Sequence, residues 1–315
     1  MQAAVVNTPG QAPKYQSFPD PEPVQGETLV RVRAAGLHPV VKAIASGQHY
    51  SAAGGYPAIP GIDGVGTLED GRRVYFGFVR KPWGTMAERA AAATKFIPVP
   101  DGLDDVTAAA IANPGMSAWM SLKERGGLTA GETVLIMGAT GVAGQLAIQV
   151  ARHLGAKRIV AAGRNIDAIA EANVDTVISL NQPEEAIREA LAAEAAQGID
   201  LVIDYLWGRP TELVLEALAR GFRAEATHRT RLIEVGSSAG PTITLPGATL
   251  RSIDLTLMGS GFGAAALDRI LAVIPTLFEL AAKKVLTIDV EAVALARVEE
   301  AWNRVEKGRR IVFTV

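Results

Sequence analysis

The chain has 315 residues, of which 49% are hydrophobic and 20% are charged, so it is long enough for about two globular domains. A formal net charge of -2 argues against a dedicated surface for nucleic acid or for an anionic membrane. The absence of cysteine excludes disulfides, a thiol nucleophile and a thiolate metal site, and no apolar run is long enough to span a bilayer. A cytoplasmic enzyme without a nucleic-acid or membrane partner is therefore expected.

Residues 1 to about 113 have the pattern of a small, irregular β-rich domain. The expected strands are Gln2–Val6, Glu27–Ala35, Arg72–Phe78 and Thr94–Val99, with one short helix at Val40–Ala45. The segment Gly47–Gly66 holds six glycines and two prolines, which predicts mostly turns and loop. Helical patterns follow at Asp104–Ala112 and Ser117–Glu124.

From Glu132 the pattern changes to alternating strands and helices, which predicts parallel strands joined by right-handed crossovers. The expected strands are 132–137, 158–162, 175–179, 199–204 and 231–236, and the expected helices are 142–154, 166–172, 183–196 and 210–220. The remainder predicts a strand at Ile253–Met258, helices at 264–283 and 293–306, and a final strand Arg310–Val315 that packs on the first domain. Gly221–Arg231 is expected to be a solvated insert.

A glycine cluster joins the first of these strands to the first of these helices. Glycines in such a turn permit a tight bend, close approach of a ligand to the backbone, and close packing of helix on strand. The amides at the helix start, together with the helix dipole, favour a pyrophosphate. We therefore predict a dinucleotide site, with a purely structural tight turn as the alternative, at Gly138, Thr140, Gly141, Val142, Ala143 and Gly144.

The end of the second strand indicates which dinucleotide binds. An acidic residue there would accept the adenosine ribose hydroxyls, whereas this chain has Gly163-Arg164-Asn165, with Arg164 standing 20 residues beyond Gly144. A guanidinium offers planar donors that suit a 2′-phosphate. The nearest acid, Asp167, lies where the next helix is expected to start. The pattern favours NADPH over NADH, and a solvated loop arginine is the alternative.

At this point the chain resembles the medium-chain dehydrogenase/reductase superfamily, specifically its zinc-free quinone oxidoreductase and enoyl reductase branch. The resemblance covers nearly the whole chain and is carried, in this order, by Ala34–His38, Ile59–Gly66, Gly138–Gly144 and Leu250–Ser260. It implies a GroES-like β-rich catalytic domain from residues 1–117 and 262–315, and a Rossmann domain with a doubly wound parallel sheet from 118–261. The fold class is thus α/β.

The resemblance also implies that no metal is bound. Zinc-dependent relatives have a cysteine near the position of His38, a histidine at Ile62 and a cysteine near Pro114. Isoleucine and proline cannot ligate zinc, and one histidine with Asp63 falls short of three ligands. Without a Lewis acid to stabilise an alkoxide, alcohol oxidation is not expected.

Further cofactor contacts come from the resemblance and from the rule that parallel sheets bind ligands beyond the carboxyl ends of their strands. They lie at the entry to the Rossmann domain, after its fourth and fifth strands, and in a covering loop. These residues are Asn113, Ser117, Leu206, Gly236, Ser237, Ser238, Phe262 and Gly263.

Two residues are candidates for proton donation. Tyr50 lies in Ser46-Gly47-Gln48-His49-Tyr50, which resembles the segment that carries the catalytic tyrosine in enoyl thioester reductases. His38 has a position where quinone reductases often carry a polar residue. The alternatives are a loop aromatic for Tyr50, a structural histidine for His38, and water as the donor. Tyr56 is a weaker candidate, and Asp63 is expected to give structural support.

The leading hypothesis is an NADPH-dependent, metal-free reductase that transfers hydride to a small-molecule quinone or α,β-unsaturated carbonyl compound. An enoyl-thioester reductase acting on a CoA or carrier-protein substrate is the second hypothesis. The third is an NADPH-binding sensor or structural protein without turnover. The apolar strand Leu255–Ser260 would be an exposed edge in a monomer, so a homodimer is expected.

Overall fold

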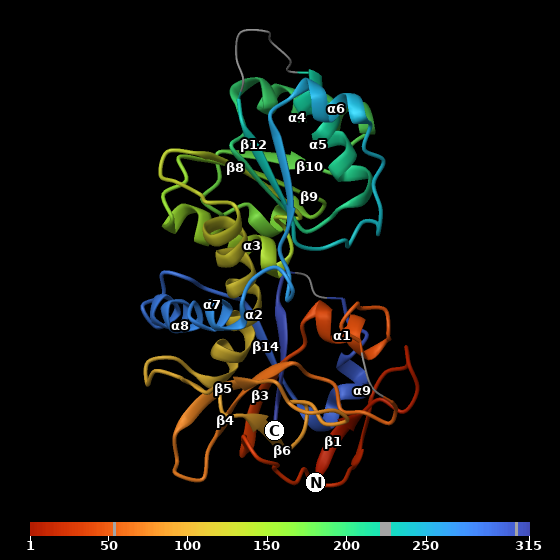
Figure 1. Cartoon of the computed structure of the whole chain (residues 1–315), viewed down its shortest axis with the longest axis vertical. Coiled ribbons are helices and arrows are strands. Elements are labelled where there is room, and N and C mark those ends of the chain that lie inside the picture. Colours follow the sequence, from red (N-terminus) through yellow and green to blue (C-terminus); the bar gives the residue numbers. More distant parts are fainter. Residues whose placement is uncertain (53–54, 221–227, 306–307) are drawn as a thin grey trace. The chain divides into compact units, whose positions relative to one another are not determined.

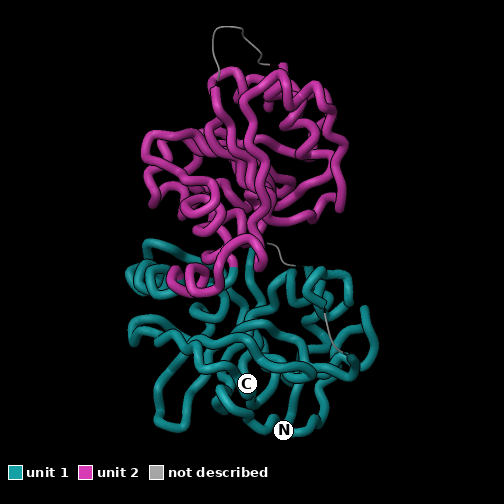
Figure 2. Tube along the Cα trace, viewed as in Figure 1, with its two compact units in different colours: residues 1–113, 274–315 teal, residues 114–273 magenta. Residues whose placement is uncertain are grey.

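The structure is a computed structural model that describes residues 1–52, 55–220, 228–305 and 308–315. The chain forms two compact units, one from residues 1–113 and 274–315 and the other from residues 114–273 (Figure 2). Most of the predicted insert, residues 221–227, lies outside the described residues. No helix in the described ranges is long and apolar enough to cross a membrane.

The first unit, residues 1–113 and 274–315, is built on a seven-stranded sheet (Figure 1). Its strand order is β14-β15-β3-β4-β5-β7, and β6 pairs with β3. The strands are β3 (Glu27–Gly36), β4 (Asp63–Thr67), β5 (Arg73–Gly77), β6 (Arg89–Ala93), β7 (Ile97–Pro98), β14 (Val290–Ala294) and β15 (Arg310–Thr314). A separate two-stranded sheet consists of β1 (Gln2–Val5) and β2 (Lys14–Ser17), and the short helices are α1 (Pro39–Ala45) and α9 (Val298–Ala301).

Strand β3 organises this unit because it pairs with β15, β4 and β6. Its middle alternates buried Val30 and Val32 with exposed Arg31 and Arg33, the pattern of a strand with one face in the core. The C-terminal strand β15 lies antiparallel to β3, which confirms the predicted strand at the end of the chain.

The second unit, residues 114–273, has a six-stranded, all-parallel sheet in the order β10-β9-β8-β11-β12-β13 (Figure 1). The strands are β8 (Thr133–Met137), β9 (Arg158–Gly163), β10 (Thr176–Ser179), β11 (Leu201–Asp204), β12 (Thr230–Glu234) and β13 (Leu255–Gly259). The helices are α3 (Val142–His153), α4 (Glu184–Gln197), α5 (Gly208–Arg220), α6 (Gly247–Ser252) and α7 (Leu267–Leu271). The order reverses direction between β8 and β11, which is where doubly wound sheets bind nucleotides.

Both faces of this parallel sheet are covered. Four consecutive residues of β8, Val134–Met137, are fully buried, as are Ile159–Ala162 of β9. Such continuous apolar runs are typical of parallel strands with helices on both sides. The alternating strand–helix order predicted from the sequence is confirmed, except that a 3₁₀ turn at Ile166–Ile169 stands in place of the helix predicted at 166–172.

Helix α2 (Asp105–Trp119) contains Pro114 and continues into a π-helical turn at Met120–Arg125. The division between the two compact units falls within this helix, after Asn113. The sequence predicted two helical stretches separated by Asn113-Pro114-Gly115, and the structure joins them into one helix.

Several predicted elements were wrong. The predicted helix 264–283 is interrupted, since α7 ends at Leu271 and α8 (Ile274–Ala282) begins afresh. Pro275 explains the break because it has no N–H to bond the Leu271 carbonyl in a continuous helix, whereas a proline is tolerated in the first turn of α8. The helix predicted at 293–306 is shortened to α9 (Val298–Ala301), because β14 (Val290–Ala294) pairs with β15 and a 3₁₀ turn at Leu295–Arg297 follows it.

Strand β4 was also missed, in a segment expected to be turns and loop. Its glycines are required by the neighbouring strand β3: a Cβ on Gly64 would lie 2.8 Å from the Ala34 carbonyl oxygen, and one on Gly66 would lie 2.4 Å from a Val30 methyl. Glycine here permits close strand packing rather than a turn.

Candidate functional site

The glycine turn lies at the carboxyl end of β8, in the second unit. Gly138 has a φ of 84°, a backbone conformation that glycine adopts without strain. The amides of Gly138 and Ala139 both donate to the Ala162 carbonyl oxygen, at 2.9 Å each. These bonds fix the turn against β9 and direct the chain into α3.

Two glycines around this turn are required by the protein's own packing. A Cβ on Gly144 would lie 2.3 Å from the Gly138 carbonyl oxygen, so only glycine lets α3 approach the turn this closely. A Cβ on Gly163 would lie 2.4 Å from the Thr140 methyl group. Thr140 thus packs directly on the end of β9, and the predicted residues Thr140 and Gly163 are neighbours.

Gly141 is different. Its φ of -83° suits any residue, and a Cβ there would meet only the Gly138 carbonyl oxygen, at an ordinary contact distance of 3.5 Å. Neither the backbone conformation nor the internal packing therefore requires glycine at this position. A glycine that the fold does not need is expected where a ligand must approach the backbone.

The start of α3 offers unpaired amides. In the first turn of a helix the N–H groups have no helical carbonyl four residues before them, and here these are the amides of Val142, Ala143 and Gly144. No side chain caps the helix at Gly141. The helix has 12 residues, so its dipole adds partial positive charge at this end. The turn and helix start fit the pyrophosphate of a dinucleotide.

Arg164 and Asn165 directly follow β9, and both are exposed. The Asn181 side-chain amide donates to the Arg164 carbonyl oxygen at 2.8 Å, which holds the backbone here. Within the described ranges no carboxylate is within ion-pair distance of the Arg164 guanidinium. Asp167 is exposed and lies in a 3₁₀ turn at Ile166–Ile169, which is shorter than the helix predicted for 166–172.

The loop after β11 is fixed by a buried carboxylate. Asp204 is fully buried, and its side chain accepts hydrogen bonds from the amides of Leu206 and Trp207, at 2.8 and 3.1 Å, and from the Thr211 hydroxyl. Burial raises the pKa of Asp204, while these three donors act in the opposite direction. The Leu206 side chain thereby contacts the turn, since a Cβ on Gly138 would lie 3.2 Å from it.

The loop after β12 is bonded to the loop after β11. The Gly236 amide donates to the Asp204 carbonyl oxygen at 3.2 Å, and the Ser238 hydroxyl donates to the Tyr205 carbonyl oxygen at 2.8 Å. Ser237 and Ser238 are exposed. The structure thus brings Leu206, Gly236 and Ser238 together at the carboxyl edge of the sheet.

Ser237 lines a hollow at this edge, together with Trp207, Glu234 and Met258. Burial raises the pKa of Glu234, and the nearby Asp204 charge raises it further. Sequence reasoning did not select Glu234, because an acid at the end of a strand has no distinguishing motif.

Asn113 and Ser117 are four residues apart on α2, so they share one side of the helix. Burial raises the pKa of the Tyr205 phenol, and the neighbouring Ser117 side chain partly opposes this. The relation of Tyr205 to Ser117 has no signal in the sequence, because the two residues are far apart along the chain. Phe262 and Gly263 follow β13 and are exposed, Phe262 by 44%.

A buried polar cluster lies in the first unit. His38 is only 1% exposed, and its Nε2 is 3.4 Å from Oδ1 of Asp63, which is 5% exposed. The Tyr75 hydroxyl donates to Oδ2 of Asp63 at 2.7 Å. Burial raises the pKa of Tyr75, and the adjacent Asp63 charge adds to the increase. The sequence suggested His38 and Asp63 separately, and Tyr75, an inward residue of β5, was missed.

Tyr50 is in a different environment. It is 74% exposed, and its ring centroid lies 4.1 Å from that of His49. The pKa of His49 is lowered by burial. The Tyr56 hydroxyl is already engaged, since it donates to the Ala45 carbonyl oxygen at 2.9 Å. Of the three predicted candidates, only His38 lies in a buried polar environment.

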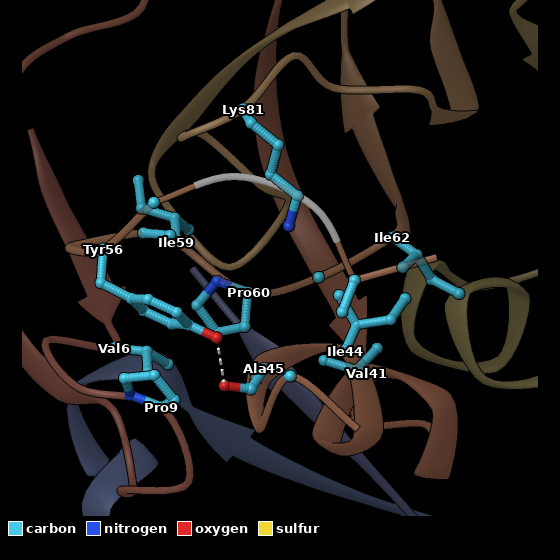
Figure 3. A pocket seen from close by; sticks show the side chains of 15 residues that line it. Val6, Pro9, Val41, Ile44, Ala45, Tyr56, Ile59, Pro60, Ile62 and Lys81 are labelled. Atoms are coloured by element: carbon cyan, nitrogen blue, oxygen red, sulfur yellow. Dashed lines mark hydrogen bonds between the residues drawn. The ribbon is translucent and has the colours of Figure 1, made fainter. Parts of the chain in front are cut away.

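A small cavity of about 130 Å³ lies beside Tyr56 (Figure 3). Its wall includes Ile62, the residue at the position where zinc-dependent relatives have a histidine. No group of three or more metal-ligating side chains is present among residues 1–52, 55–220, 228–305 and 308–315.

These features define a class of protein with a nucleotide-type parallel-sheet unit and an antiparallel β-rich unit. No family model matches the chain. A probable NADPH-dependent quinone reductase of Emericella nidulans is 27% identical, with 99% of each chain aligned. An acryloyl-coenzyme A reductase of Sulfurisphaera tokodaii is 30% identical over 50% of this chain and 58% of its own.

Solved structures agree with the fold. The quinone oxidoreductase of Thermus thermophilus, which was solved alone and in complex with NADPH, is 26% identical. It aligns over 100% of both chains with a TM-score of 0.80. The chain is therefore similar over its whole length to quinone oxidoreductases, in agreement with its resemblance to the zinc-free branch of the medium-chain dehydrogenase/reductase superfamily.

Replacement of Gly144 by alanine should lower stability, whereas replacement of Gly141 by alanine should lower only the affinity for NADPH. Gly144→Ala forces a Cβ against the Gly138 carbonyl and should lower the free energy of unfolding by about 1–3 kcal/mol. Gly141→Ala has room, so its melting temperature should match the wild type while its affinity for NADPH falls. Thermal melts and fluorescence titration with NADPH measure both effects, and equal NADPH affinity in Gly141→Ala would contradict the phosphate assignment.

Proposed function

We propose that this protein is an NADPH-dependent, metal-free oxidoreductase that reduces a quinone or an α,β-unsaturated carbonyl compound. The observation that carries the proposal is the turn at Gly138–Gly144, where Gly141 is open to a ligand, together with the exposed Arg164 that directly follows β9. The similarity to an NADPH-dependent quinone reductase and to a quinone oxidoreductase that was solved with NADPH supports it.

The residues present fit NADPH. The first-turn amides of α3 would hold the pyrophosphate, and the Arg164 guanidinium would bind the 2′-phosphate as a planar fork of donors. The loops at Leu206 and at Gly236–Ser238 lie at the carboxyl edge of the sheet, where the nicotinamide half is expected. When bound, the nicotinamide supplies the hydride.

The acceptor class follows from the absence of zinc ligands at Ile62 and Pro114. Quinones and enones delocalise incoming charge onto an oxygen, so a hydrogen-bond donor is sufficient to stabilise it. We propose His38 and Tyr50 as the candidate donors, with water as the alternative. His38 is supported by its buried contact with Asp63, and Tyr50 by its position in the loop after α1.

An enoyl-thioester reductase is the second candidate. The similarity to an acryloyl-coenzyme A reductase favours it. Both candidates use the same hydride chemistry and differ in the group that the acceptor carries. A non-catalytic NADPH-binding protein is the remaining alternative.

We further propose a cytoplasmic homodimer that pairs through β13. This strand ends the order of the parallel sheet, and Leu257 on it is 37% exposed. An apolar edge strand is otherwise a site of unwanted pairing. Sedimentation at twice the chain mass of 33.0 kDa would support the dimer, and a monomer at micromolar concentration would contradict it.

NADPH oxidation with three acceptors tests the function. We expect turnover with a small quinone or enone to exceed turnover with crotonyl-CoA by at least about tenfold in kcat/KM, a difference of about 1.4 kcal/mol. The reverse order would assign the enoyl-thioester function. Tight NADPH binding without oxidation by any acceptor would leave only the non-catalytic alternative.

Arg164→Ala tests the cofactor assignment. Loss of a guanidinium–phosphate pair should raise KM for NADPH about 10- to 100-fold and leave KM for NADH nearly unchanged. Arg72→Ala, at an exposed arginine of the first unit, is the matched control. Equal effects of Arg164→Ala on both cofactors would refute the role of Arg164.

Two substitutions identify the proton donor. If His38 donates, His38→Asn should lower kcat by about 10²-fold, and if Tyr50 donates, Tyr50→Phe should do so. Tyr15→Phe is the control for loss of a phenol hydroxyl elsewhere in the first unit. Full activity in both variants would assign the proton to water, and deuterium solvent isotope effects on kcat would then be retained in both.

A further inference from the structure

The cavity in the first unit has an unusual charge distribution (Figure 3). Its walls come from α1, from the segment around Tyr56–Ile62 and from the N-terminal segment near Val6. Among the described residues that line it, Lys81 is the one charged side chain. The charge that this cavity can offer a ligand therefore comes from one ammonium group.

The apolar part of the cavity is small. Val41, Ile44 and Ile59 contribute aliphatic walls (Figure 3). The Tyr56 ring faces the same space, and its hydroxyl donates a hydrogen bond to the Ala45 carbonyl oxygen. The volume is about 130 Å³. An engineered apolar cavity of about 150 Å³ in another protein binds benzene, so this one accepts a group of about one six-membered ring.

Lys81 lies at the mouth of the cavity, and its ammonium points toward it (Figure 3). Lys81 is an exposed residue, and partial burial lowers the pKa of its ammonium group. No carboxylate of the described residues is within ion-pair distance of it. The neighbouring Arg80, by contrast, pairs with Glu27 and lies over the Trp83 ring.

A partly buried cation beside a cavity with aliphatic walls favours a ligand with the complementary arrangement, an anionic group next to an apolar one. We propose that this cavity selects an acceptor that carries a carboxylate on an apolar part of about one ring in size, with Lys81 as the specificity-determining residue. The proposal rests on the reductase function proposed above and narrows its substrate class.

The reaction with such an acceptor balances without a further reagent. For an enone acid, hydride from NADPH adds to one alkene carbon and a proton adds to the other. The carbon–carbon double bond becomes a single bond, NADPH becomes NADP⁺, and the carboxylate remains unchanged. Lys81 binds the carboxylate and takes no part in the hydride or proton transfer.

The competing explanation is that the Lys81 stem covers apolar surface while the ammonium remains in water. Lys81→Met separates the two, because methionine keeps an unbranched stem and removes the charge. Lys81→Arg keeps a positive charge and serves as the conservative variant. Lys283→Met, at an exposed lysine that follows α8, makes the same change in net charge away from the cavity.

The first measurement uses 4-oxopent-2-enoate and its methyl ester, which share one carbon skeleton and differ in charge. In the wild type, kcat/KM should be higher for the acid. Lys81→Met should lower the acid-to-ester ratio of kcat/KM by about 10- to 100-fold. Lys81→Arg should retain most of the ratio, and Lys283→Met should retain all of it. An unchanged ratio in Lys81→Met would overturn the proposal.

The second measurement does not depend on turnover. Isothermal titration of 4-oxopentanoate, the saturated acid, into the protein with NADP⁺ should give a Kd at least about tenfold weaker in Lys81→Met than in the wild type. Methyl 4-oxopentanoate should show no such difference. If no acceptor is reduced, the proposed function fails, and this titration still decides the role of Lys81. Equal Kd values for the acid in both proteins would overturn it.

Discussion

The close contact between Gly144 of helix α3 and the carbonyl of Gly138 is the constraint on which the nucleotide-binding unit depends. Because the distance leaves no space for a side chain, α3 starts directly above the end of β8. Its first amides then face the carboxyl edge of the sheet, at the point where the strand order reverses. If α3 were further from the end of β8, its first amides would no longer lie beside the loops that follow β11 and β12.

Those loops depend on a second buried group, the Asp204 carboxylate. It accepts hydrogen bonds from the backbone amides of Leu206 and Trp207, which have left the sheet. The chain therefore leaves β11 in a fixed conformation. The loop after β12 is then hydrogen-bonded to the same segment through Gly236 and Ser238. Burying a carboxylate costs free energy, and the donors around Asp204 offset that cost while ordering the candidate nicotinamide region.

The β-rich unit follows a different principle. Its polar centre consists of His38, just after β3, Asp63 in β4 and Tyr75 in β5. These three strands are adjacent in the sheet but separated in the sequence. The cavity near Tyr56 joins α1 to the segment before β4 in the same way. The chemistry proposed for the acceptor thus comes from pairings that no local pattern specifies.

The sequence by itself determined the parallel-sheet unit, its strand order in the chain, the glycine turn and the position of Arg164. It could do so because these features are local: an apolar run, a glycine cluster and a helix pattern follow one another within a few residues. Only the tertiary structure decided that Gly144 and Gly163 are needed for packing while Gly141 is not. It likewise revealed Tyr75, shortened the helix expected at 293–306 to α9 by pairing β14 with β15, and placed Lys81 at a cavity with aliphatic walls. Those outcomes depend on contacts between residues far apart in the chain, which have no periodic signature along it.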